Sequence, residues 1–209
     1  MKVLLINGSP RAKGNTFIAL SEVANTLQAE GIDTQIIHIG TQPVRGCVAC
    51  GACRKNNTHC AFSDLLYDQL RQILDEGIDG LVVGSPVYYA GPNGALCAIL
   101  DRVFYAASSN FAFKPGASIV SCRRGGASAS FDRLNKYFTI SNMPVVSSEY
   151  WSMVHGNTPE EVVKDVEGMQ TMRTLAKNMA WLLKCIEAGD KAGIERPQRE
   201  AKINTNYIR

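Results

Sequence analysis

Apolar residues recur along the chain in two alternating patterns. Short aliphatic runs, the first at 3–7, alternate with longer segments whose apolar residues lie three or four positions apart, as at Phe17, Leu20, Ala24 and Leu27. The first pattern is typical of buried strands and the second of amphipathic helices. We expect strands at 3–7, 34–39, 79–84, 117–122 and 144–146. We expect helices at 17–30, 63–74, 93–107, 127–140 and 158–188. Ser63 and Thr158 are the expected N-caps of two of these helices, and Gly31 ends the first.

Strands separated by helices predict an α/β fold with a parallel sheet, right-handed crossovers and helices on both faces. Five strands favour a doubly wound sheet in the order 2-1-3-4-5, which is the flavodoxin-like arrangement. We therefore expect one domain over 1–188 that contains a cysteine-rich loop at 43–62. A polar tail follows at 189–209.

Charge and composition limit the classes of partner that this protein could have. The net charge is 22 − 19 = +3, which is too weak to indicate a nucleic acid or a membrane surface as a partner. No apolar run approaches the roughly 18 residues that span a bilayer. The apolar run at 3–6 is too short for a signal peptide. We expect a cytoplasmic protein, in which most of the seven cysteines stay reduced.

The turn after the first strand has the composition of a phosphate site. Gly14 lets the backbone approach a ligand closely, and the next helix begins there with free N–H groups and a positive dipole end. Ser9, Asn15 and Thr16 add short hydrogen-bonding side chains, and Arg11 adds positive charge. The turn lacks the P-loop and dinucleotide glycine patterns. It therefore predicts a site for a phosphate ester of another kind.

The turn after the third strand can hold a flat ring. Doubly wound sheets bind ligands at the carboxyl ends of their strands, near the point where the strand order reverses. Tyr88 and Tyr89 offer stacking surface and hydroxyl groups, and Pro86 and Val87 precede them. We expect these residues to contact the ring.

The turn after the fourth strand supplies a further candidate contact. Gly125 and Gly126 allow close approach, and Arg124 or the local backbone amides would favour a negatively charged ligand.

Together these turns resemble one family. G-S-P-R at 8–11 followed by G-N-T at 14–16, S-P-V-Y-Y at 85–89 and R-G-G at 124–126 are similar to motifs of the NADPH-dependent FMN reductase and iron–sulfur flavoprotein superfamily. The resemblance extends to about residue 156. It implies FMN as cofactor, a flavodoxin-like fold and a homodimer or homotetramer with each ring near a subunit interface.

The cysteine-rich loop carries a second candidate site. Cys47, Cys50, Cys53 and Cys60 follow the spacing C-x₂-C-x₂-C-x₆-C, and closely spaced thiolates are typical ligands of iron–sulfur clusters. The spacing is similar to the compact motif of iron–sulfur flavoproteins, which implies a [4Fe–4S] cluster that exchanges electrons with FMN. Two alternatives stay open, namely a zinc ion held by the same thiolates and free thiols without a metal.

The leading functional hypothesis is a flavin oxidoreductase without a catalytic side chain. Electrons would come from NAD(P)H or a ferredoxin-like donor and leave to a small acceptor. Three alternatives stay open. One is an NAD(P)H:FMN or quinone reductase without a cluster, and one is a flavodoxin-like electron carrier without turnover of its own. The third is a zinc-stabilised interaction protein that has lost FMN.

Overall fold

The computed structural model describes residues 1–201, 203 and 205. A parallel sheet lies at the centre of this part of the chain. Its parallel strands follow the order β2-β1-β3-β5-β6. Their bounds are β1 (Lys2–Asn7), β2 (Asp33–His38), β3 (Gly80–Tyr88), β5 (Gly116–Cys122) and β6 (Met153–His155). The short strand β4 (Gly91–Pro92) pairs antiparallel with the end of β3. The expected parallel α/β sheet is confirmed, but the five-stranded order 2-1-3-4-5 is not exact, because β4 adds a sixth strand between β3 and β5 in the chain.

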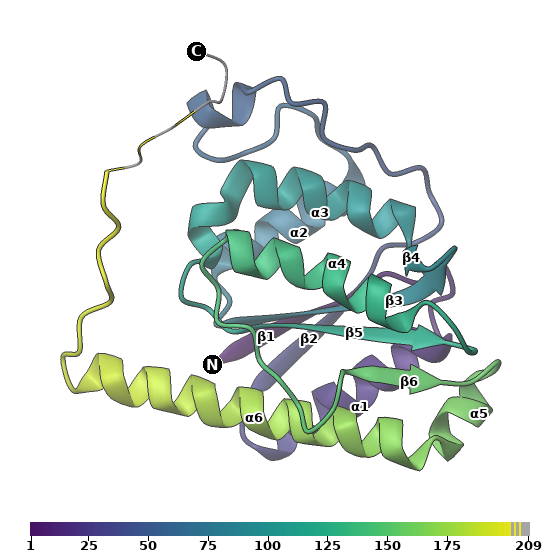
Figure 1. Ribbon diagram of the computed structural model, residues 1–209. Helices are drawn as coiled ribbons and strands as arrows, with labels where there is room; N and C mark the ends of the chain where they lie inside the picture. Colours follow the sequence, from purple (N-terminus) through teal and green to yellow (C-terminus); the bar gives the residue numbers. More distant parts are fainter. Residues whose placement is uncertain (202, 204, 206–209) are drawn as a thin grey trace.

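Helices cover both faces of the sheet. Their bounds are α1 (Asn15–Ala29), α2 (Leu65–Glu76), α3 (Gly94–Ala107), α4 (Ala127–Ile140), α5 (Pro159–Lys164) and α6 (Val166–Lys191). Figure 1 shows α1 and α6 on one face and α2, α3 and α4 on the other. Two short 3₁₀ helices are η1 (Ala52–Lys55) and η2 (Ser108–Phe111). In the described part of the chain, every helix is too short or too polar to cross a membrane.

Strand β1 illustrates why its sequence is apolar at consecutive positions. Val3 and Leu5 pack into the core with α1 and α6, whereas Leu4 and Ile6 pack into the core on the other face. Each of these side chains is at most 3% exposed. Full burial of one such side chain stabilises the fold by about 1.5–3 kcal/mol, so both faces of β1 contribute.

The expected strand at 144–146 is wrong. Val145 forms a single bridge with Gly116, and the fifth parallel strand is β6, which pairs with β5 from Val120↔Met153 onward. Only Val154 of β6 is fully buried. A strand this short has no apolar run to reveal it in the sequence.

The N-cap of helix α2 lies one residue later than expected. Asp64 is its N-cap, and the carboxylate accepts a hydrogen bond from the amide of Tyr67 at 3.0 Å. Ser63 instead donates to the carboxylate of Asp68. Both Ser and Asp cap helices well, so composition could not separate them.

The expected helix at 158–188 is two helices. Thr158 caps only α5, and Asp165 leaves the helical conformation with ψ 80°. Its side chain then accepts a hydrogen bond from the amide of Gly168 at 2.9 Å and starts α6. Residues 194–201 continue from α6 as an irregular segment (Figure 1). Positions 202, 204 and 206–209 of the predicted tail lie outside the described residues.

Candidate functional site

Loops at the carboxyl ends of β1, β3, β5 and β6 surround one cleft. The strand order explains this, because β1 lies next to β3 and β3 lies next to β5. The predicted residues that line the cleft are Ser9, Arg11, Asn15, Thr16, Pro86, Val87 and Tyr88. The lining residues that sequence reasoning missed are Ser121, Cys122, Arg123, Gly156 and Asn157. The remaining predicted residues, which lie outside this lining, are Gly14, Tyr89, Arg124, Gly125 and Gly126.

A buried asparagine shapes the first loop. Asn7 is fully buried at the end of β1, and its side-chain oxygen accepts a hydrogen bond from the amide of Ser9 at 3.1 Å. Its side-chain nitrogen donates to the carbonyl of Ala12 at 3.1 Å. His38 on β2 donates from Nε2 to the carbonyl of Ser9 at 2.7 Å. These contacts hold the loop in one conformation ahead of any ligand.

The start of α1 is suited to an anion. The N-cap is Gly14, so no side chain caps this helix, and its first turn has no acidic residue within the described part of the chain. Within residues 1–201, the backbone amides of Asn15 and Thr16 have no hydrogen-bond acceptor. A Cβ at position 14 would come within 3.1 Å of Arg11 Cβ and 3.5 Å of Ser9 Oγ. Glycine therefore keeps the space inside the loop free of a side chain. Uncapped amides at a helix N-terminus fit a phosphate group.

The side chains of Asn15 and Thr16 have structural partners. Asn15 Nδ2 donates to the carbonyl of Gly156 at 2.7 Å, and Thr16 Oγ1 shares a hydrogen bond of 2.8 Å with Ser121 Oγ. These bonds join the start of α1 to the ends of β5 and β6. The backbone amides of this turn, rather than the two side chains, are therefore the groups left to bind a ligand.

A hairpin supports the second loop. β4 folds back on β3, pairing Tyr88 with Gly91, and the amide of Asn93 donates to Ser85 Oγ at 2.9 Å. Tyr88 is 48% exposed within the cleft lining, whereas Tyr89 is fully exposed with a left-handed φ of 50°. The hairpin thus directs only the first of the two tyrosines into the cleft.

The third loop contributes through its first residues. Cys122 and Arg123 line the cleft. Gly126, with φ 89°, packs against the second loop, because a Cβ there would lie 2.7 Å from Ala90 Cα. Cys122 Sγ lies 3.4 Å from His155 Nδ1, and burial raises the pKa of the Cys122 thiol. At neutral pH this thiol is a neutral part of the wall rather than a thiolate.

The four clustered cysteines share a second cavity, here called the cysteine hollow. Its lining includes Cys47, Cys50, Cys53 and Cys60 together with Phe62, Arg102 and Tyr105. Cys47 and Cys50 are exposed, Cys60 is half-buried and Cys53 is buried. Among the residues described, no three His, Cys, Asp or Glu side chains stand in an arrangement that could hold a metal ion. The loop brings the four thiols to one cavity but leaves them apart.

The sheet order and the covering helices define a flavodoxin-like α/β protein. A solved archaeal flavodoxin has the same fold, with a TM-score of 0.59 and 15% identity, and covers 88% of this chain and 99% of its own. RosB, solved with bound 8-demethyl-8-formylriboflavin-5'-phosphate, has a TM-score of 0.70 and 16% identity, and covers 100% of this chain and 92% of its own.

Sequence comparison defines the family. The model of the NADPH-dependent FMN reductase family matches residues 1–158, and the chain belongs to that family of FMN-dependent oxidoreductases. An iron–sulfur flavoprotein of Methanocaldococcus jannaschii is 29% identical over 198 residues, which cover 90% of this chain and 100% of the relative. The resemblance inferred from the three loop motifs is thereby confirmed.

Proposed function

We propose that the cleft at the strand ends binds FMN and that the chain uses it to transfer electrons. The observation that carries this proposal is the uncapped start of α1, which opens into the cleft beside Tyr88. The amides of Asn15 and Thr16 are the proposed phosphate ligands, and Arg11 supplies positive charge. In this proposal, the hydrogen bonds of Asn7 preorganise the loop for FMN.

FMN, when bound, supplies one- and two-electron redox chemistry that ordinary side chains lack. The protein holds and orients the ring. Pro86, Val87 and Tyr88 offer it an apolar wall, and Arg123 adds positive charge to the cleft. A role for Tyr89 and for the Arg-Gly-Gly turn at 124–126 stays a prediction.

NAD(P)H or a ferredoxin-like donor is the proposed source of electrons, and a small molecule is the proposed acceptor. The family's description as NADPH-dependent FMN reductases supports a nicotinamide donor. To test this assignment, NADPH is added anaerobically and the absorbance of the bound flavin is followed at about 450 nm. We expect the absorbance to fall on the order of seconds. Reduction by dithionite alone would favour a carrier that receives its electrons from a protein donor.

For the cysteine loop we propose a [4Fe–4S] cluster held by Cys47, Cys50, Cys53 and Cys60. Two observations support this assignment. All four thiols line one cavity, and the relative from M. jannaschii is named an iron–sulfur flavoprotein. Thiolate ligands suit such a cluster, which supplies one-electron chemistry when bound.

A reductase without a cluster is the second candidate. Cys47 and Cys50 are exposed, and the described residues lack a preformed metal-binding group, which favours this alternative. In that case NAD(P)H would deliver electrons to FMN directly, and a free flavin or a quinone would accept them.

One experiment separates the two candidates. The protein is purified anaerobically, its absorption spectrum is recorded, and iron, acid-labile sulfide and FMN are measured per chain. The first candidate predicts flavin bands, a broad cluster shoulder, and iron and sulfide in equal amounts. Cys53→Ser should then lose the iron and keep the FMN, with Cys185→Ser as the matched control at an exposed cysteine on α6. FMN without iron supports the second candidate, and a colourless protein that does not bind added FMN sinks both.

We also propose a homodimer or homotetramer in the cytoplasm. Two exposed aromatic side chains support a subunit interface, since Tyr89, next to the cleft-lining Tyr88, is fully exposed and Trp151, just before β6, is 55% exposed. Light scattering after size-exclusion chromatography measures the mass. A monomer at micromolar concentration would contradict this part of the proposal.

A further inference from the structure

A buried arginine lies beside the cysteine hollow. Arg102 comes from α3, its side chain is 0% exposed, and it lines the hollow together with the four cysteines. Arginine keeps its positive charge when buried, and an isolated charge in a protein interior is unfavourable. A cation at this position therefore calls for partners of opposite charge or strong hydrogen-bond acceptors.

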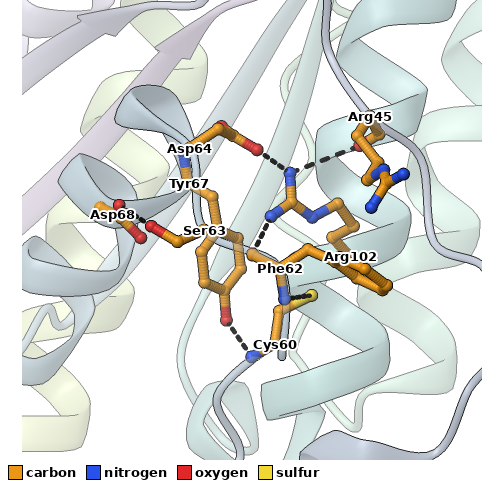
Figure 2. Close-up of polar contacts among 8 residues, drawn as sticks. All are labelled: Arg45, Cys60, Phe62, Ser63, Asp64, Tyr67, Asp68 and Arg102. Atoms are coloured by element: carbon orange, nitrogen blue, oxygen red, sulfur yellow. Dashed lines mark hydrogen bonds and ion pairs between the residues drawn. The ribbon is translucent and has the colours of Figure 1, made fainter.

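The contacts of Arg102 reach both ends of the cysteine loop. Figure 2 shows its guanidinium between the backbone of Arg45, before the first cysteine, and that of Phe62, after the last. It donates to the carbonyl of Phe62 at 2.5 Å and makes a longer contact of 3.5 Å with the carbonyl of Arg45. It also pairs with the carboxylate of Asp64, the N-cap of α2. One side chain on a rigid helix thus holds the two ends of the loop together.

Cys60 is tied to the same group of residues. Its amide donates to the hydroxyl of Tyr67 at 2.7 Å, and the ring of Tyr67 lies 4.5 Å from the guanidinium carbon of Arg102. The cation and the ring therefore place one of the four cysteines relative to α2 and α3.

One nitrogen of the guanidinium remains without a partner. Arg102 Nε is buried and has no acceptor among the described residues. Buried polar groups are nearly always hydrogen-bonded, so this unpaired donor leaves one place for an acceptor beside the cysteine loop. A group ligated by thiolates is negatively charged and offers sulfur acceptors to such a donor.

We infer that Arg102 is the positioning residue of the cysteine loop, fixing its two ends and, together with Asp64, setting the charge beside a cluster held by the four thiolates. The part that concerns the charge rests on the proposed cluster. The part that concerns the loop does not, because it applies equally to the metal-free protein. The two parts call for two measurements.

The first measurement uses metal-free full-length protein and hydrogen exchange of residues 46–61. Arg102→Lys keeps the charge but loses the planar fork that reaches two carbonyls and a carboxylate. We expect exchange across the loop to accelerate by tenfold or more. Arg133→Lys, at a half-exposed arginine on α4, is the matched control and should leave the loop unchanged. Unchanged exchange in Arg102→Lys would overturn the role in positioning, and an unchanged affinity for FMN confirms that the variant is folded.

The second measurement uses the reconstituted protein and the midpoint potential of its cluster. Asp64→Asn keeps an N-cap but removes the negative charge, so the cluster should become easier to reduce. Arg102→Met removes the positive charge and leaves Asp64, so the cluster should become harder to reduce. We expect opposite shifts, each a tenfold change in the reduction equilibrium, or about 59 mV for a one-electron couple.

The outcomes separate this inference from the proposed cluster. A purely structural arginine would lower the iron content of both variants without opposite shifts in potential, and that result would overturn the role in charge. If Arg102→Met does not fold, Asp64→Asn alone decides, because a potential equal to that of the wild type would refute the electrostatic argument. A wild-type protein that binds no iron would sink the proposed cluster and with it the charge role, while loop exchange still decides the positioning role.

Discussion

Replacing Asn7 by alanine tests whether the first loop is preorganised for phosphate. The side chain is fully buried and makes two hydrogen bonds of 3.1 Å, one to the amide of Ser9 and one to the carbonyl of Ala12. Each such bond contributes about 0.5–1.5 kcal/mol, so the pair contributes roughly 1–3 kcal/mol to the loop conformation. If the whole of that free energy is lost from binding, the affinity for FMN drops about 5- to 140-fold, since 1.4 kcal/mol is a factor of ten.

The assay compares FMN with riboflavin, which has the same ring but lacks the phosphate. Asn7→Ala should weaken FMN binding strongly and riboflavin binding much less, as measured by quenching of flavin fluorescence. Asn25→Ala, at an exposed asparagine on α1, is the control and should leave both affinities unchanged. An equal loss for the two ligands would refute the reasoning, because it would mean that Asn7 does not act on the phosphate site.

Three further predictions follow from single groups. Burial raises the pKa of Asp64, but its bonds to Arg102 and to a backbone amide outweigh this and lower the pKa below its ordinary value of 3.8. The pair therefore stabilises the protein above that pH and loses its effect as the pH falls further. Urea titrations between pH 7 and pH 3 should show a smaller fall in the free energy of unfolding for Asp64→Asn than for the wild type. An equal fall in the two proteins would contradict this. Because burial raises the pKa of Cys122, iodoacetamide at pH 7 should label it far more slowly than the exposed Cys185, and equal rates by mass spectrometry would be the contrary result. Gly126→Ala should strain the left-handed backbone by roughly 1–3 kcal/mol and displace the second loop. The melting temperature and the affinity for FMN should both fall, and values equal to those of the wild type would refute this.

The sequence revealed the parts of the fold that have strong local signals. The continuous apolar run of β1 and the periodic apolar positions of α3 predicted these elements with an error of one residue in their bounds. The short strand β6 and the break before α6 depend on tertiary contacts, namely pairing with β5 and the side chain of Asp165. Local patterns carry little information about either.

The candidate site divides in the same way. A glycine and short polar residues marked the first loop directly, and the two tyrosines marked the second, because a close phosphate requires the former and a flat ring suits the latter. Ser121 escaped notice because its role comes from a bond to Thr16, more than a hundred residues earlier in the chain. Arg102 was not predicted as a site residue either, although it adjoins the buried Val103 and follows the buried Ile99 on α3. A cation within an apolar helix face is a signal that could have singled it out.

A crystal structure of the complex with FMN tests the central claim most directly. We expect the phosphate within hydrogen-bond distance of the amides of Asn15 and Thr16, and the ring against Val87 and Tyr88. A phosphate bound elsewhere on the molecule, with the start of α1 left to solvent, would contradict it.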